Sequence, residues 1–159
     1  MNAMNAMNDK MHLLLQRKSA VEVGVPEGLK EILNAGFVRI GECILFSSFF
    51  KETSLPSDQF LIRAYGDLTG YECAVNKIHV EDYCEENVLG SAVGFVSYFS
   101  EVWRGKFGDE AIVILTYEED NDFGEVCTFR FHLNRVGQKF IDPGEINKYP
   151  EAILMSSVL

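Results

Sequence analysis

AIVILTYEEDNDFGEVCTFRFHL, residues 111–133, contains two segments with the patterns of β-strands. Residues 111–117 are almost wholly apolar, as in a central strand that is covered on both faces. After an acidic turn over 118–124, polar and apolar side chains alternate, which is typical of a strand with one face in the core. The core face then carries Cys127, Phe129, Phe131 and Leu133, and the polar face carries Val126, Thr128, Arg130 and His132.

One long helix is predicted upstream of this pair, over residues 82–104. Asp82 can accept hydrogen bonds from the free N–H groups of the first turn while Glu85, three residues later, reaches back to it, as in a capping box. Gly105 and Gly108 mark its end. The apolar stripe of the helix has spacings of 4, 3, 3 and 4 and consists of Leu89, Val93, Val96, Phe99 and Trp103.

Shorter elements are predicted nearer the N-terminus. Residues 26–34 predict a short helix, because proline opens the segment and apolar residues recur at helical spacing. β-Branched and aromatic residues predict a strand over 37–46. Residues 60–65 and 71–80 have similar composition, and the turn-forming residues between them indicate a second hairpin.

Together these elements predict an α+β fold, in which one long helix (about 82–104) packs across an antiparallel β-sheet and a short N-terminal helix is added. We expect a single domain over residues 12–159, because no long Pro/Gly/Ser-rich linker divides the chain. Residues 1–11 begin with a repeated MNA triplet that is not apolar enough to anchor itself. We therefore expect a disordered N-terminal segment over 1–11.

The overall composition fits a globular domain with its own core. The chain has 159 residues, of which 47% are hydrophobic, and a domain of this length buries about two-thirds of the surface of its unfolded chain. No apolar run reaches the roughly 18 residues of a membrane span. The four cysteines form no C-x-x-C pair and the N-terminus lacks a secretion signal, so we expect a reduced, cytoplasmic protein.

Charge is distributed very unevenly along the chain. The formal net charge is −10, and residues 81–125 carry 12 acidic side chains against only Arg104 and Lys106, while the other 114 residues carry 12 acids and 12 bases. Helix capping and solvated turns explain part of this cluster but not the missing bases. A field of this sign repels nucleic acids and anionic membranes and attracts cationic partners, so we expect binding to neither nucleic acid nor membrane.

The sequence holds no recognisable catalytic, cofactor or metal motif. Phosphate-binding loops, G-x-S-x-G and H-E-x-x-H are absent. A calcium loop counted from Asp120 fails, because Glu125 and Phe131 occupy the positions that require glycine and glutamate. We therefore expect a protein that is not an enzyme and that has no cofactor and no metal.

Two alternatives remain open. The polar strand face Thr128, Arg130 and His132 could serve a small-molecule binding module or an enzyme, if a hollow lies over it. A structural subunit of a larger assembly is the other possibility, for which an apolar patch could be formed by Phe49, Phe50 and Leu55.

The central third of the chain resembles a family of small cytoplasmic bacterial immunity proteins, those paired with toxins of contact-dependent growth inhibition and related polymorphic systems. The likeness rests on size, acidic balance and the run WRGKFGDE over 103–110, which leads into the apolar run 111–117 and the acidic turn EEDND over 118–122. The resemblance implies a non-enzymatic inhibitor that binds a cognate toxin, often a basic nuclease, and blocks its active site or substrate surface.

A partner-binding surface is therefore expected among the acidic residues. Acidic groups pair with the lysines and arginines of a nuclease, which speeds encounter and suppresses wrong partners. Affinity must also come from a central part of the surface that loses its water on binding. Tyr83, Tyr117 and Phe123 are aromatic residues among the acids and are the candidates for this central part. The expected partner-binding residues are Glu81, Asp82, Glu85, Glu86, Asp109, Glu110, Tyr117, Glu118, Glu119, Asp120, Asp122, Phe123 and Glu125. The oligomeric state is left open.

Overall fold

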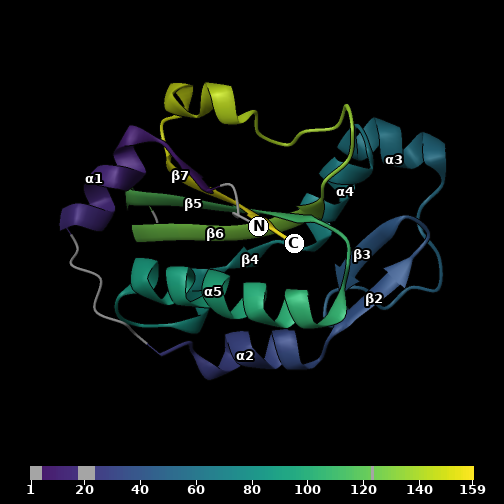
Figure 1. Ribbon diagram of the computed structural model, residues 1–159, viewed down its shortest axis with the longest axis horizontal. Coiled ribbons are helices and arrows are strands. Elements are labelled where there is room, and N and C mark those ends of the chain that lie inside the picture. The colour runs from purple at the N-terminus through teal and green to yellow at the C-terminus, as the bar shows by residue number, and fades with distance from the viewer. Residues whose placement is uncertain (1–4, 18–23, 123) are drawn as a thin grey trace.

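The computed structural model describes residues 5–17, 24–122 and 124–159, and an antiparallel sheet of five strands lies at its centre (Figure 1). The two strands predicted over 111–133 are both present, lie side by side in this sheet and pair with Ala111 opposite Leu133. In spatial order the strands are β1 (Asn5–Met7), β7 (Ala152–Val158), β5 (Ala111–Asn121), β6 (Gly124–Leu133) and β4 (Ile78–His79).

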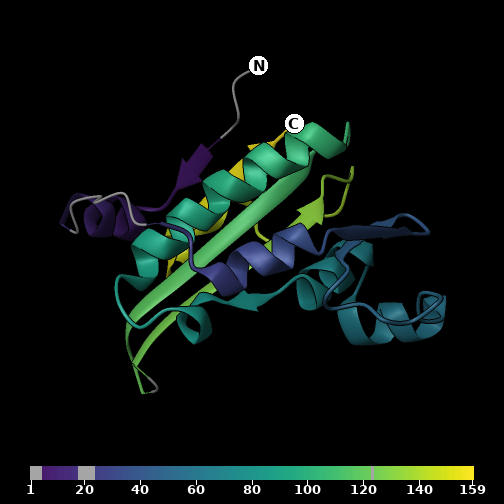
Figure 2. The same cartoon turned by 90° about the horizontal axis from the view of Figure 1, so that it is seen from below.

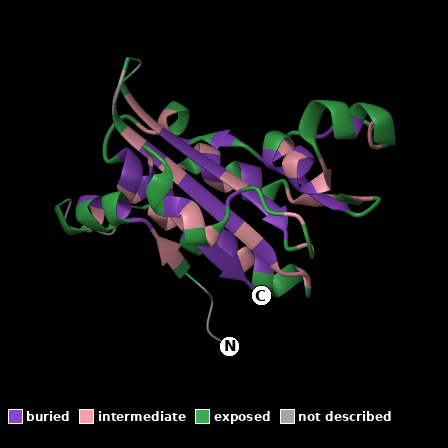
Figure 3. Cartoon of the chain, turned by 90° about the horizontal axis from the view of Figure 1, so that it is seen from above, coloured by how far each residue is buried: buried purple, intermediate pink, exposed green. Residues whose placement is uncertain are grey.

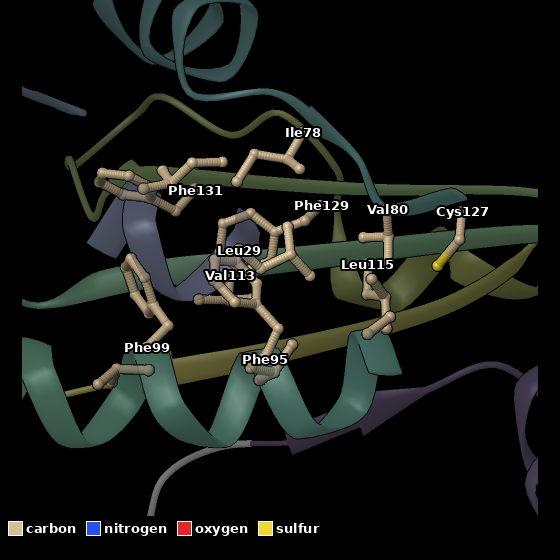
Figure 4. Packing of buried hydrophobic residues seen from close by; sticks show 14 of the residues in the cluster. Leu29, Ile78, Val80, Phe95, Phe99, Val113, Leu115, Cys127, Phe129 and Phe131 are labelled. Atoms are coloured by element: carbon tan, nitrogen blue, oxygen red, sulfur yellow. The ribbon is translucent and has the colours of Figure 1, made fainter. Parts of the chain in front are cut away.

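The long helix α5 (Val88–Lys106) covers one face of the sheet and confirms the predicted α+β fold. Phe95 and Phe99 point from this helix to Phe129 and Phe131 of β6, with ring centroids 4.9 Å apart for Phe95–Phe129 and 5.0 Å for Phe99–Phe131 (Figure 4). The short helix α2 (Glu27–Asn34) lies beside α5, close to its predicted position. Edge-to-face and tilted aromatic contacts therefore hold the helical layer to the strands.

A second layer covers the other face of β5. Ile114 of β5 and Ile153 of β7 are fully buried there against Ile141 and Ile146, which come from the segment around the 3₁₀ helix η2 (Pro143–Lys148). The apolar run of β5 is thus covered on both faces, as its sequence predicted (Figure 3).

Helix α5 begins six residues later than expected. Residues Val80–Tyr83 form a separate 3₁₀ helix, η1, so that Asp82 does not cap α5. The cap is Asn87, whose side-chain oxygen accepts a hydrogen bond from the N–H of Gly90 at 3.2 Å. The proposed capping box of Asp82 and Glu85 is therefore wrong, because the chain first turns along the edge of β6 before it enters the helix.

The predicted hairpin over 60–80 is also wrong. Its residues form two short helices, α3 (Asp58–Tyr65) and α4 (Leu68–Val75), and only β4 is extended. Ser57 and Asp67 cap them by accepting hydrogen bonds from the N–H groups of Phe60 and Gly70. A Cβ at position 70 would lie 2.1 Å from the carbonyl oxygen of Tyr65, so the tight corner between the helices requires glycine there.

The strand predicted over 37–46 is a two-stranded hairpin. β2 (Phe37–Ile40) pairs with β3 (Cys43–Phe46) through a two-residue loop that places Ile40 opposite Cys43. Gly41 has φ +56°, as the first central residue of a type II′ turn requires. This hairpin is a sheet of its own and is not paired with the central one.

Helix α4 fastens the hairpin to the central sheet through buried polar side chains. Glu72 accepts hydrogen bonds from the N–H of Ile44 on β3 at 3.0 Å and of Leu133 on β6 at 2.9 Å. Asn76, one turn later, accepts from the N–H of Phe46 at 2.9 Å and donates to the carbonyl of Ile44 at 3.0 Å. These side chains satisfy backbone groups of two strand edges that no neighbouring strand covers.

Arg135 completes this arrangement with a salt bridge to Glu72, in which the N–O distance is 2.5 Å. The Glu72 side chain is 0% exposed and the Arg135 side chain 14% exposed, so the ion pair is almost fully removed from water. We call Glu72, Asn76 and Arg135 the edge clamp.

The N-terminal segment is structured further than expected. Residues 1–11 were predicted to be disordered, but β1 pairs with β7 and helix α1 (Asp9–Arg17) follows it. Asn8 between them is 1% exposed and accepts a hydrogen bond from the N–H of Ile153 at 2.9 Å. Disorder is therefore wrong for residues 5–11, and residues 1–4 lie outside the described part. In that part, no helix is long and apolar enough to cross a membrane.

Candidate functional site

Two acidic segments that are distant in sequence meet at one end of the sheet. Glu81 in η1 accepts a hydrogen bond from the N–H of Cys127 on β6 at 2.8 Å. Burial raises the pKa of the Cys84 thiol, and the nearby carboxylates of Glu125 and Glu81 raise it further. The first turn of α5 lies at the same end as the connection between β5 and β6 (Figure 2).

We call this surface the acidic end. Asp82, Glu85, Glu86, Glu119 and Asp122 are exposed there, and the other acids are partly buried. The side chain of Asp120 and the whole of Phe123, both predicted partner contacts, lie outside the described residues. The described members of the acidic end are Glu81, Asp82, Glu85, Glu86, Glu118, Glu119, Asp122 and Glu125.

Asp109 and Glu110 do not belong to this surface. They precede β5 and therefore lie at the opposite end of that strand, where Asp109 forms a 2.6 Å salt bridge with Arg39. Glu110 accepts hydrogen bonds from the Ser157 hydroxyl and from the Asn134 side chain, and these hold the pKa of its carboxyl below the usual value. Both acids bind neighbouring segments of the fold, so their prediction as members of one partner surface with the hairpin acids does not fit.

The aromatic candidates differ in accessibility. Tyr83 is 37% exposed beside the acids and remains a candidate contact. Tyr117 is 0% exposed, and its hydroxyl donates a 2.5 Å hydrogen bond to Glu125. Tyr117 is therefore part of the core and cannot touch a docked partner, which corrects its prediction as a contact residue.

The polar face of β6 divides into two parts. His132 is 3% exposed and hydrogen-bonds the carbonyl of Leu133 through Nδ1 at 2.7 Å, so it lines no open hollow. Burial lowers the pKa of its imidazole, which keeps it neutral. Arg130 instead lies between two open hollows, each with a volume of about 390 Å³. Of the predicted trio, Thr128 and Arg130 line a hollow and His132 does not.

Lys77 and Lys139 face the first of these hollows together with Arg130, and the sequence analysis missed both lysines. Lys77 immediately follows α4 and Lys139 lies between β6 and η2, so no sequence spacing connects them. Among the described residues, no three His, Cys, Asp or Glu side chains gather as a metal site requires.

The apolar patch predicted for a structural subunit is not formed as proposed. Phe50 is 8% exposed and packs with Leu61 and Tyr71 in a core between β3 and α4, and Leu55 packs against the same cluster. Phe49 is 37% exposed. Only one of the three residues is therefore open to solvent.

Comparison with known proteins gives one family and one curated relative. The model of the Uncharacterized protein PM0498 family matches residues 6–158, which is nearly the whole chain. Uncharacterized protein PM0498 of Pasteurella multocida (strain Pm70) is 30% identical over 125 residues, which cover 77% of this chain and 78% of the relative. No solved structure matches.

Proposed function

This chain belongs to the Uncharacterized protein PM0498 family, and we propose that it is a non-enzymatic immunity protein that binds and neutralises a cognate toxin domain, one with a basic surface such as a nuclease. The observation that supports the proposal is the convergence of two acidic segments, 81–86 and 118–125, at one end of the molecule. The proposed binding surface is the acidic end, with Tyr83 as its exposed aromatic residue.

Electrostatics favours this use of the acidic end. Five of its carboxylates are exposed, Glu119 pairs with Arg17, and Glu81 lies 3.4 Å from the imidazole of His79. Carboxylates so arranged repel one another, which costs folding stability that a cationic partner restores on binding. Nuclease surfaces carry lysines and arginines for phosphates, and occupation of those groups by carboxylates prevents substrate binding.

Binding kinetics test the proposal directly. The proposal predicts a toxin gene beside this one, and the partner to use is the C-terminal domain of that toxin. The variant is Glu118→Lys, Glu119→Lys, Asp120→Lys and Asp122→Lys together. We expect association to slow by about 10- to 100-fold at low ionic strength, with a smaller difference at physiological salt, because steering depends on unscreened charge. Protection of cells against the toxin should fail in parallel.

The matched control places the same charge change elsewhere. Glu42, Glu52, Asp58 and Glu101 are all exposed and belong to elements or turns outside the acidic end, and their replacement by lysine also changes the net charge by eight. This control should keep most of the association rate. An equal loss of association rate in both variants would mean that only net charge matters. Unchanged binding by the variant with lysine at 118, 119, 120 and 122 would show that the acidic end does not recognise the toxin.

A further inference from the structure

We infer that the hollow between α4 and β6 is a binding site for a small phosphate monoester, held by Arg130, Lys77 and Lys139. Residues of α3 and α4 line the hollow, and these two helices lie at the opposite end of the sheet from the β5–β6 connection (Figure 1). It is therefore separate from the acidic end, and this inference does not depend on the proposed immunity function.

The walls of the hollow come from three parts of the fold. One side of α4 contributes Gly70 and Cys73, and Lys77 continues this side at helical spacing just beyond the helix. β6 contributes Arg130, and the segment after β6 contributes Lys139 and the ring of Phe140. A volume of about 390 Å³ lies within the range of small-molecule sites.

Arg130 is the residue that most favours an anionic ligand in this hollow. Its side chain is partly buried, and this burial lowers the pKa of the guanidinium, while the nearby Glu151 carboxylate offsets part of the shift. No described carboxylate forms an ion pair with it, and the guanidinium packs over the face of Phe140, with its carbon 5.4 Å from the ring centroid. A partly buried cation that no described carboxylate contacts in a salt bridge gains from an anionic ligand, and its planar fork matches phosphate oxygens.

The charge balance of the hollow fits a doubly charged anion. Three cationic side chains line it, and Asp67 is its one carboxylate. Asp67 caps α4 through a 2.8 Å hydrogen bond from Gly70, so its carboxylate is already engaged by the helix. Three positive charges less one leave +2, and a phosphate monoester carries between −1.5 and about −2 at neutral pH.

The second hollow beside Arg130 does not share this character. Its lining includes Glu118 and Glu151, and Arg130 is its one cation. Its charge is therefore −1, which disfavours an anion. The phosphate site is assigned to the first hollow alone.

The first hollow holds no activated nucleophile. Burial raises the pKa of the Cys73 thiol to about 12, so that the thiol stays protonated at neutral pH. The inference is therefore one of binding. The rings of Tyr65 and Phe140, which are 36% and 40% exposed, border the site and favour a ligand whose phosphate is attached to a planar or apolar group.

Calorimetric titration with phenyl phosphate tests the inference. The wild-type protein should bind it saturably, and Lys77→Gln with Lys139→Gln should weaken binding by at least about tenfold, because two charge-assisted contacts are lost. Both lysines are exposed, so the double variant should fold normally. Lys51→Gln with Lys148→Gln removes two exposed lysines outside the hollow and should bind within about twofold of wild type.

Two further ligands decide the chemical class. Inorganic phosphate should bind more weakly than phenyl phosphate but with the same dependence on Lys77 and Lys139, whereas succinate, a dianion without phosphate geometry, should not compete. The inference is overturned if phenyl phosphate does not saturate, if both double variants bind alike, or if succinate binds as well as phosphate. Arg130→Gln provides an independent check and should also weaken binding by about tenfold or more.

Discussion

Glu72 and the residues of the acidic end all carry a carboxylate, which is buried at Glu72 and lies at the surface in the acidic end. The Glu72 side chain is 0% exposed and accepts hydrogen bonds from two backbone N–H groups and from Arg135. Asp82 and Asp122 at the acidic end are exposed. A buried carboxylate with all its partners holds two sheets together, whereas an exposed one contributes little to folding and remains accessible to another molecule. Stability and recognition should therefore depend on different acids.

The strongest test of this contrast is the replacement Glu72→Ala. It leaves the N–H groups of Ile44 and Leu133 and the charge of Arg135 without their buried partner, so we expect the free energy of unfolding to fall by about 3–5 kcal/mol. Chemical denaturation measures this loss. The matched change Glu52→Ala, at an exposed position, should stay within about 0.5 kcal/mol of wild type.

Glu72→Gln covers the case in which the alanine variant does not fold. Glutamine keeps one carbonyl acceptor but removes the charge, so the free energy of unfolding of this variant should lie between those of wild type and Glu72→Ala. Stability equal to wild type in both variants would show that the edge clamp contributes nothing, and the contrast with the acidic end would disappear.

Mild acid should weaken the clamp region through His132, which lies beside Glu72 and Arg135. Burial lowers the pKa of His132 below the ordinary histidine value of 6.5, so the unfolded chain takes up a proton as the pH falls below 6.5 while the folded protein does not. The free energy of unfolding should therefore decrease with falling pH, by at most about 1.4 kcal/mol per pH unit from this group. Denaturation curves between about pH 6.5 and 5 measure the slope.

Two variants isolate this contribution. His132→Gln should flatten the slope, whereas His12→Asn, at an exposed histidine, should preserve it. A slope that is the same in His132→Gln and in wild type would mean that His132 already takes up its proton in the folded state.

The smallest effect is expected at the exposed ion pair between Arg17 and Glu119. Its N–O distance of 2.6 Å is short, but the two side chains are 61% and 40% exposed. Solvent screening limits such a pair to about 0.5 kcal/mol, so Arg17→Ala should hardly change the free energy of unfolding. A loss comparable with that of Glu72→Ala would show that the acidic end is structural as well, which would weaken the proposed division of roles.

The central layers of the fold were predictable because burial imposes a period on the sequence. The apolar run of β5 and the stripe from Leu89 to Trp103 on α5 have the spacing that their packing requires. Helices α3 and α4 were mistaken for strands because they are only eight residues each and contain residues typical of strands. Their capping residues, Ser57 and Asp67, were the signal that could have identified them.

The candidate sites were predictable only in part, since tertiary contacts assemble them. The acidic excess identified the segments around Glu81 and the β5–β6 connection, but not that Glu110 binds Ser157 instead of joining them. Arg130 was placed correctly on the polar strand face. Lys77 and Lys139 could not be connected with it, because three separate segments meet at the hollow.

The position of β7 has a consequence for synthesis of the protein. This strand lies between β1 and β5, although its residues, 152–158, are translated long after both of them. Until Val158 has emerged from the ribosome, β7 cannot pair with either strand. The nascent chain then exposes the hydrogen-bonding edge of β5, and β1 has no neighbouring strand. The sheet can therefore close only after translation has passed Val158, and until then its open edge is a place where a chaperone or a second unfinished chain can bind.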